Sequence, residues 1–160
     1  DDEVDVGITR SLHHPQLESF HIYDEQIVLV TYPEHPFASL KAVSVEDVGH
    51  EPLILYDKDS TYYRLISSVC SRAGIDPNIV MDLDSIEATK KMVIDKLGVS
   101  FLPMSSLKME IDMGLIVTVP LKGGVKVTLP TSILYRKGRA TSGVVKSFLG
   151  VIKQLYKKPS

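Results

Sequence analysis

Several stretches of the chain carry the hydrophobic pattern of β-strands. Residues 4–9 alternate apolar and polar side chains, which is typical of a strand with one buried face. Residues 26–32 form a nearly continuous β-branched run that predicts a strand buried on both faces. Pro33 ends this run, because proline cannot donate a hydrogen bond to a neighbouring strand. Further strands are predicted at residues 52–56, 78–83, 99–102, 115–119 and 125–135.

Between these strands the apolar residues change to helical spacing. From Ser60 to Ala73 they recur every three or four residues, which predicts a helix capped at its start by Asp59 or Ser60 and closed by Gly74. The inner face of this helix is predicted to consist of Tyr62, Ile66, Val69, Cys70 and Ala73.

Three more helices follow from the same spacing. The first begins at Asp84-Ser85, with Glu87 placed to reach back to a cap at Asp84, and it stops at Gly98. The second runs from Pro103, a favoured first helical residue, to about Met113. The last is amphipathic, with Val144, Phe148, Ile152 and Leu155 on its apolar face.

Strands that alternate with helices predict an α/β fold with a mainly parallel sheet. Gly123-Gly124, between the last two strands, favours a tight turn with positive φ. The chain has no internal repeat and no Gly/Ser-rich linker, so two lobes, if present, would be joined through strands.

The composition argues against several classes of protein. The 160 residues include 18 basic and 20 acidic side chains, a formal charge of −2, whereas nucleic-acid-binding domains carry a basic excess. One cysteine allows no internal disulfide and fits a reducing compartment. No apolar run approaches the roughly 20 residues that span a bilayer, and the acidic start is unlike a signal peptide. Because the chain does not begin with Met, we expect a fragment of a longer protein.

The residues offer little catalytic chemistry. Nucleotide-binding glycine motifs and a nucleophile elbow are absent from the sequence. Cys70 lies on the apolar face of a predicted helix, where a buried, inert thiol is expected. The five histidines show no helical i, i+4 pair, so no metal site is expected. Asp82 and Asp84 share a strand face and form either a carboxylate dyad or, the favoured reading, a helix cap. We therefore expect no enzyme, no metal and no cofactor.

Three places have the character of a binding site. Ligands of open α/β sheets sit at the carboxyl ends of strands, where helix N-termini point amides outward. Ser60 and Thr61 follow the strand at 52–56, and one hydroxyl is expected to cap the helix while the other remains free for an anion. Pro103 and Met104, with Ser105 and Ser106, follow the strand at 99–102. Thr9 and Arg10 follow the first strand, where the arginine is either a solvated side chain or a carboxylate clamp.

Several segments, taken in order, resemble the effector-binding domain of LysR-type transcriptional regulators. They are residues 4–8 (Val-Asp-Val-Gly-Ile), residues 25–30 followed by His35-Pro36-Phe37-Ala38, and residues 45–48 followed by the strand 53–56. The most specific is the stretch from Ser85 to Val93 followed by Leu97 to Pro103, which the family writes as a helix ending in Gly-x-Gly-x-x-x-x-Pro. Lys96 replaces the usual first glycine, a departure expected to matter little at a helix end.

The resemblance implies a fold like type 2 periplasmic binding proteins, with two α/β lobes and a ligand cleft between them. Lobe I would hold residues 1–27 and 132–160, and lobe II residues 28–131. The family domain begins with an earlier strand, helix and strand, so lobe I is expected to be incomplete at its N-terminus. The family's DNA-binding helix-turn-helix is absent from the 160 residues. The effector contacts of the family match Thr9, Arg10, Ser60, Thr61, Pro103 and Met104.

The function implied is that of a cytoplasmic sensor. We expect it to bind a small, anionic metabolite, a carboxylate, and to alter DNA binding by the full-length regulator. The segment from Ile86 to Pro103 resembles most the catabolite-control members of the family, which respond to citrate or similar acids. The family assembles as homodimers or tetramers, and the helix at 60–74 carries Tyr63, Leu65 and Val69 beyond a narrow stripe, so part of it is expected to face a partner. The alternative is a solute-binding protein of a transport system with the same fold. An enzyme on this fold would need a nucleophile or acid–base pair that the sequence does not offer.

Overall fold

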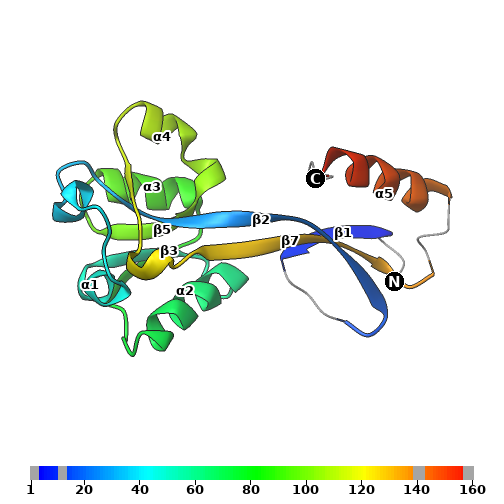
Figure 1. Ribbon diagram of the computed structural model, residues 1–160, viewed down its shortest axis with the longest axis horizontal. Helices are drawn as coiled ribbons and strands as arrows, with labels where there is room; N and C mark the ends of the chain where they lie inside the picture. Colours follow the sequence, from blue (N-terminus) through cyan, green and yellow to red (C-terminus); the bar gives the residue numbers. More distant parts are fainter. Residues whose placement is uncertain (1–3, 11–13, 139–142, 157–160) are drawn as a thin grey trace. The chain divides into compact units, whose positions relative to one another are not determined.

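The chain folds as two compact units. The computed structural model describes residues 4–10, 14–138 and 143–156. Unit 1 is Asp1–Glu25 together with Leu129–Ser160, and unit 2 is Gln26–Thr128. Both unit boundaries fall inside strands, namely β2 (Leu17–Thr31) and β7 (Val127–Arg136), so the chain passes between the units without a loop (Figure 1).

The sheet is mixed, whereas the alternation of strands and helices predicts a mainly parallel one. Its hydrogen-bonded order is β1-β7-β2-β5-β3-β4, and β6 (Val117–Val119) also pairs with β2. Within unit 2, β3 (Leu53–Tyr56) runs parallel to β4 (Ile79–Leu83) and β5 (Val99–Pro103). β2 runs antiparallel to β5 and to β6. Only the strands joined by helical crossovers are parallel, because an antiparallel pair needs no such crossover.

Four helices accompany the strands of unit 2. They are α1 (Val45–His50), α2 (Thr61–Arg72), α3 (Ile86–Ile94) and α4 (Lys108–Asp112). Figure 1 shows α2 on one face of the unit 2 sheet and α3 on the other. Three short 3-10 segments complete the unit, namely η1 (Pro36–Ser39), η2 (Met104–Ser106) and η3 (Lys122–Gly124). In η3 the φ angles of Gly123 and Gly124 are 73° and 68°, as the Gly-Gly turn predicts.

The helix starts confirm one predicted cap and correct two expectations. The Oγ of Ser60 accepts a hydrogen bond from the Tyr63 N–H at 3.0 Å, so Ser60 is the N-cap of α2. α3 is capped by Ser85 and not by Asp84, and Glu87 pairs with Lys90 instead of reaching back. The single helix predicted from Pro103 is also wrong. Pro103 ends β5 with an extended ψ of 127°, and η2 and α4 follow it as separate turns.

The core of unit 2 lies between β3, β5 and α2. Tyr62 and Ile66 of α2 are fully buried, and so is Cys70, where burial raises the pKa of the thiol. The Tyr62 hydroxyl donates a hydrogen bond to the Phe101 carbonyl, and its ring stacks on Tyr56 with centroids 4.2 Å apart. Through its ring and its hydroxyl, Tyr62 therefore attaches the start of α2 to β3 and to β5.

Unit 1 is built from both ends of the chain. β1 (Val6–Arg10) pairs antiparallel with β7, and α5 (Gly143–Leu155) packs on a small core. This core consists of Ile133, Tyr135, Val145 and Leu149, flanked by Val6, Phe20, Ile22 and Ile152. β2 begins at Leu17, well before the strand predicted at 26–32. The prediction relied on a continuous run of β-branched residues, and residues 17–25 instead alternate apolar and polar side chains.

A left-handed residue ends the turn after α3. Lys96 has a φ of 65°, the region that favours glycine, at the position where the LysR-type motif carries glycine. Its ammonium pairs with Glu34 at 3.0 Å, and both side chains are exposed, so this pair offsets little of the backbone strain. The departure from glycine therefore carries a conformational cost that the sequence pattern does not reveal.

Two substitutions separate the backbone strain from the ion pair. Both Lys96→Gly and Lys96→Ala remove the contact with Glu34, but only glycine also relieves the Cβ clash of the left-handed conformation, worth about 1–2 kcal/mol. Glycine loses more chain entropy on folding, so we expect Lys96→Gly to be about 1 kcal/mol more stable than Lys96→Ala. Urea unfolding of both variants measures the difference. Equal stability would show that the φ angle at this position is not strained.

Candidate ligand-binding edge

Four of the six predicted site residues lie along one edge of the unit 2 sheet. β3 and β5 are parallel neighbours, so their carboxyl ends meet at the same edge. Ser60 and Thr61 follow β3, and Pro103 ends β5 with Met104 next to it. In the antiparallel neighbour β2, Ile27 stands opposite Pro103, which brings Gln26 to the same edge. We call these five residues, Gln26, Ser60, Thr61, Pro103 and Met104, the carboxyl edge.

A strained turn places α2 at this edge. Asp57 has a φ of 54°, in the left-handed region that non-glycine residues rarely adopt. Its N–H donates to the Leu83 carbonyl at 2.7 Å, and its own carbonyl accepts from the Ser60 N–H at 2.9 Å. These bonds hold the turn and direct the first amides of α2 toward the edge. Strain of this kind clusters at ligand sites, where the surrounding structure maintains it.

The two hydroxyls of the turn have different roles. Ser60 is committed to capping through its bond to the Tyr63 N–H. Thr61 is half-buried, and its Oγ1 accepts a bond of 3.3 Å from the Arg64 guanidinium, which leaves the hydroxyl proton without an acceptor among the described residues. Arg64 also donates to the Asp59 carbonyl at 3.0 Å, so its charge is held beside the helix start. Sequence reasoning did not select Arg64.

A buried ion pair supports the segment that carries Met104. Lys90 of α3 reaches Glu110 at 2.7 Å, Glu87 at 2.8 Å and the Ser106 carbonyl at 3.1 Å. The side chains of Lys90 and Glu110 are each only 6% exposed. The hydrogen bond from Lys90 lowers the pKa of Glu110; burial disfavours charge on Lys90, but its bonds to Glu110 and Glu87 outweigh this and raise the pKa of Lys90. Lys90 thereby ties η2 and α4 to α3.

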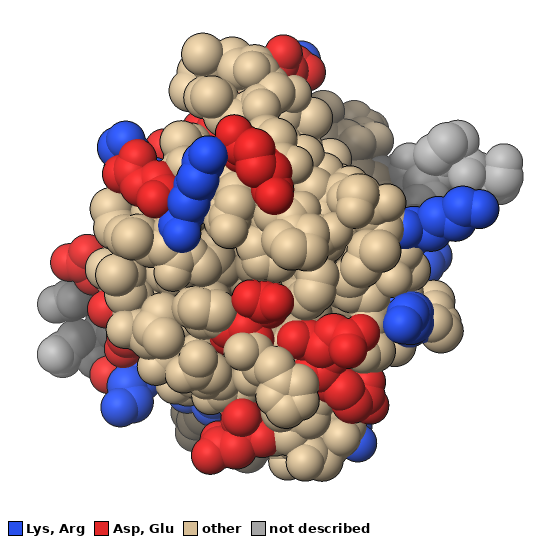
Figure 2. All heavy atoms as spheres, turned by 90° about the vertical axis from the view of Figure 1, so that its left-hand side faces the viewer, with Lys and Arg blue, Asp and Glu red and all other residues tan. Residues whose placement is uncertain are grey.

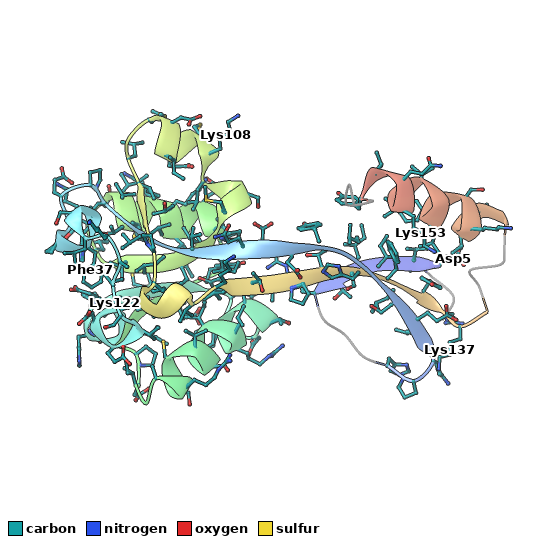
Figure 3. All side chains as sticks on the ribbon, viewed as in Figure 1. Asp5, Phe37, Lys108, Lys122, Lys137 and Lys153 are labelled. Atoms are coloured by element: carbon teal, nitrogen blue, oxygen red, sulfur yellow. The ribbon has the colours of Figure 1, made fainter. Side chains whose placement is uncertain are left out.

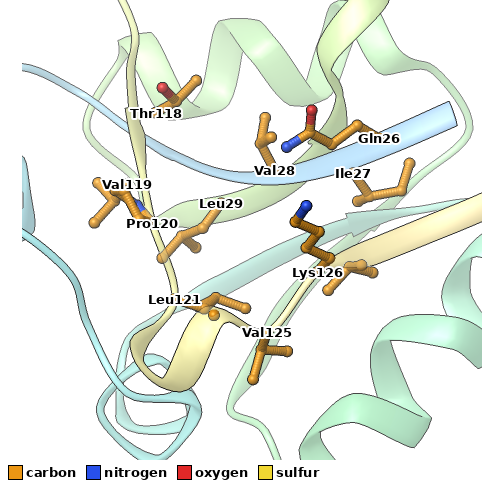
Figure 4. A pocket seen from close by; sticks show the side chains of 12 residues that line it. Gln26, Ile27, Val28, Leu29, Thr118, Val119, Pro120, Leu121, Val125 and Lys126 are labelled. Atoms are coloured by element: carbon orange, nitrogen blue, oxygen red, sulfur yellow. The ribbon is translucent and has the colours of Figure 1, made fainter.

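A hollow of about 290 Å³ adjoins the carboxyl edge at Gln26. It lies between β2 and the segment from β6 to the start of β7, and Leu29, Leu121 and Val125 supply apolar lining. Figure 4 shows the Lys126 side chain pointing its ammonium toward β2. Lys126 has no ion pair with any residue in the described part of the chain, so the hollow presents a positive charge. No local pattern marks Gln26 or Lys126, because only the strand register brings them together.

Thr9 and Arg10, the other two predicted site residues, belong to unit 1. They lie at the end of β1, opposite Ser132 and Thr131 of β7, and both are half-exposed. Within the described ranges Arg10 makes no ion pair. The sequence predicted these residues just beyond the first strand, whereas they are the last two residues of β1 and pair with β7; the role of Arg10 as a ligand contact stays a prediction.

The structure does not support a site at Asp82 and Asp84, the other candidate pair from the sequence. Asp82 and Asp84 are both exposed, and neither caps α3, so the favoured cap reading is wrong. Among the described residues, no three histidine, cysteine or acidic side chains gather as a metal site would require. Figure 2 looks at one end of unit 2, where acidic and basic side chains are interspersed among uncharged areas. This face has no continuous basic patch of the kind that binds nucleic acid.

Comparison with known proteins shows to which family the chain belongs. Residues 1–157 match the family model described as the LysR substrate binding domain. The chain belongs to this family. The LysR substrate-binding domain shares 32% identity over 139 residues with a probable RuBisCO transcriptional regulator of Guillardia theta, covering 85% of this chain and 44% of that protein. It shares 26% over 157 residues with the malolactic fermentation system transcriptional activator of Lactococcus lactis, covering 96% and 53%. It thus spans about half the length of these relatives.

Solved structures show the same fold for the LysR substrate-binding domain. The regulatory domain of Synechocystis CcmR in complex with 2-PG aligns with a TM-score of 0.86 at 19% identity, over 98% of this chain and 76% of that one. The effector-binding domain of QuiR in complex with shikimate aligns with a TM-score of 0.83 at 20% identity, over 98% and 74%. The fold is therefore that of type 2 periplasmic binding proteins. No helix within the described residues combines the length and apolar character needed to cross a membrane.

Proposed function

We propose that this domain senses a small carboxylate for a transcriptional regulator, and that units 1 and 2 are the two lobes of the effector-binding fold. The curated relatives are named as transcriptional regulators. Structures of the same fold hold shikimate and benzoate, both of which carry a carboxylate. In this proposal the longer protein contacts DNA through another domain, and ligand binding acts on its dimer or tetramer.

The carboxyl edge carries the proposal. The first amides of α2 have no partner within the helix and bear a partial positive charge, which favours an anion. Thr61 has a free hydroxyl proton beside them, and the Arg64 guanidinium lies within 3.3 Å of Thr61 Oγ1. Asp57 and Asp59 oppose an anion on the solvent side of the turn. A carboxylate therefore binds best on the inner side, toward Gln26 and the hollow that Lys126 lines.

Binding becomes a signal only if the ligand prefers one conformation of the protein. A ligand that binds two states equally well shifts nothing between them, however tightly it binds. The strained Asp57 turn and the ion-paired η2 segment are the parts of unit 2 that a bound carboxylate would contact or adjoin. We infer that the ligand stabilises the present arrangement of these two segments and that the regulator reads this preference.

A panel of acids tests the proposed function. Thermal melts and titration calorimetry of the chain with benzoate, shikimate, citrate and 2-phosphoglycolate are expected to identify at least one ligand. A hundredfold excess over Kd would stabilise the fold by about 2.7 kcal/mol. The amide of the bound acid serves as the control and should bind at least tenfold more weakly. If the amide binds as well as the acid, the anion-site interpretation is wrong.

The paired hydroxyls give a sharper prediction. Ser60→Ala removes only the cap and is expected to reduce the unfolding free energy by about 1 kcal/mol while leaving ligand affinity unchanged. Thr61→Val is nearly isosteric, so it should leave stability unchanged and weaken the carboxylate about tenfold, or about 1.4 kcal/mol. Thermal melts and titrations of both variants measure this. If Thr61→Val binds like the wild type, only the capping role of this turn survives.

Arg10 is the corresponding prediction for unit 1. If its guanidinium clamps the carboxylate, Arg10→Ala should weaken binding by about 1.5–3 kcal/mol, because a charged hydrogen bond is lost. Lys146→Ala, an exposed charge on α5 of the same unit, is the matched control and should leave affinity unchanged. Titration calorimetry compares the two. Unchanged affinity in Arg10→Ala would assign this residue to the solvated surface.

A further inference from the structure

A second groove lies on unit 2, away from the start of α2. It is a hollow of about 550 Å³ between the later half of α2, α1 and the segment from η3 into β7. Such a volume falls within the range of small-molecule sites, roughly 300–1,000 Å³. The α2 residues that line it, from Leu65 to Ala73, follow the helix away from Thr61 and the carboxyl edge.

The groove is apolar inside. Val45 and Val127 are 9% and 3% exposed, and they form part of the lining together with Leu65 and Val69 of α2. Leu65 and Val69 are four residues apart and share one flank of the helix, while Tyr62, Ile66 and Cys70 face the core. Val125 contributes an apolar side chain that is 45% exposed. α2 thus carries a second apolar flank that the core of unit 2 does not use.

Positive charges border this apolar lining. Arg72, Lys122 and Lys126 line the groove, against a single acidic side chain, Glu46. The Arg72 guanidinium donates only to the carbonyl and hydroxyl of Ser68 on its own helix, both at 3.3 Å, and makes no ion pair with a described residue. Its positive charge is therefore not balanced within unit 2.

Lys122 has a more distant counter-charge than the other paired lysines. It is the first residue of η3, labelled in Figure 3, and its ammonium is 3.8 Å from the Asp47 carboxylate. That carboxylate also belongs to the capping box of α1, where hydrogen bonds with the Ser44 side chain and with the Ser44 N–H, the latter at 3.3 Å, lower its pKa. The mouth of the groove therefore offers the Arg72 guanidinium, which has no ion pair among the described residues, and the Lys122 ammonium, whose carboxylate partner Asp47 is 3.8 Å away.

We propose that this groove binds a second ligand, a small organic acid with an apolar body. The apolar part rests against Leu65, Val69 and Val125, and the acid group meets Arg72 and Lys122. An uncharged apolar molecule would leave these two cations unused, and a purely polar anion would not displace water from the valine and leucine lining. The site goes beyond the proposed function: Leu65, Val69 and Arg72 line only this groove, whereas Val125 and Lys126 also line the hollow beside the carboxyl edge.

Octanoate is a suitable probe, with 1-octanol as its uncharged counterpart. Titration of the full chain, followed by methyl NMR, is expected to show octanoate shifting the methyl groups of Leu65 and Val69, which line this groove and not the hollow at Gln26. Arg72→Gln and Lys122→Gln should each weaken octanoate roughly three- to fivefold, the effect of removing one exposed charge. Lys108→Gln, on α4 and well apart from η3 in Figure 3, should leave affinity unchanged.

A separate set of variants distinguishes the groove from the carboxyl edge. Thr61→Val should leave octanoate binding at the groove unchanged, even if the carboxyl edge proves to bind nothing. Val69→Asp places a negative charge in the lining and should abolish octanoate binding, while circular dichroism confirms the fold. If 1-octanol binds as well as octanoate, or if the shifted methyl groups lie at the carboxyl edge, the groove is not an acid site.

Discussion

Replacing Lys90 by methionine is expected to reduce the unfolding free energy by about 3–5 kcal/mol, because it leaves a buried carboxylate without its cation. Glu110 is 6% exposed and is paired with Lys90 at 2.7 Å. Its second oxygen, Oε2, is buried and has no hydrogen-bond partner in the described part of the structure. The glutamate therefore depends on Lys90 alone for its counter-charge, and urea unfolding of Lys90→Met measures the loss.

A double variant provides the control. In Lys90→Met with Glu110→Leu no charge remains buried, so most of the lost stability should return, as for other buried pairs replaced by apolar side chains. If the double variant is as unstable as Lys90→Met, the loss comes from packing of the lysine stem and not from the orphaned charge.

Acid titration of the wild type reports on the same pair. The pKa of Glu110 is held below its ordinary value of 4.5 in the folded protein. Its contribution to stability is therefore present above pH 4.5 and is lost as the pH falls through the lowered value. Glu110→Gln removes this part of the acid dependence, so its stability should fall less steeply below pH 4.5 than that of the wild type.

Gly98→Ala is expected to cost about 3 kcal/mol by overpacking, near the upper end for a single added methyl. A Cβ at this position would lie 2.2 Å from the Pro52 carbonyl oxygen and 3.3 Å from the Ile54 side chain. The Pro52 carbonyl cannot retreat without loss, since it accepts the Val99 N–H at 2.9 Å. The substitution therefore pushes apart β3 and β5, the two strands that form the carboxyl edge.

Gly150→Ala is the matched control. Gly150 lies within α5 with no atom near an added Cβ, so alanine should raise the helix propensity and stabilise the protein by about 0.5–1 kcal/mol. Opposite signs for the two glycine-to-alanine changes are the expected result in urea unfolding. A small effect at Gly98 would mean that the Pro52 carbonyl can shift without loss of the strand pairing.

Local patterns predicted the parts of the fold that depend on neighbours along the chain. The β-branched run at 26–32 and the helical stripe from Tyr62 to Cys70 both correspond to elements of the structure, and Ser60 caps α2 as one of two predicted choices. The strand from Leu17 to Glu25 was missed because its apolar positions are interrupted by charged and polar residues on its other face. Strand direction was also misjudged, since antiparallel pairing leaves no mark on hydrophobic spacing.

In the candidate site, too, some residues can be predicted from neighbours along the chain and others depend on how distant strands pair. The sequence predicted the positions of Ser60, Thr61, Pro103 and Met104 at strand ends, because strand ends can be read from a sequence; their role as ligand contacts stays a prediction. Arg64, Lys126 and Gln26 were not found, because their places depend on side-chain direction and on the register of strands distant in sequence. Lys90 could have been noticed, since it is four residues after Ile86 on the inner face of α3, where a charge requires a partner.

The passage of the chain through β2 and β7 has a consequence during protein synthesis. Unit 2 is one continuous stretch, Gln26–Thr128, whereas unit 1 needs both Asp1–Glu25 and Leu129–Ser160. Ribosomes synthesise a chain from its N-terminus at roughly 5–20 residues per second. The carboxyl edge can therefore form on the nascent chain before β7, the pairing partner of β1, is complete. Until then the apolar side chains of Val6, Phe20 and Ile22 are not covered by the core that they flank. This order leaves the apolar side of β1 and of the first half of β2 exposed until β7 has been synthesised.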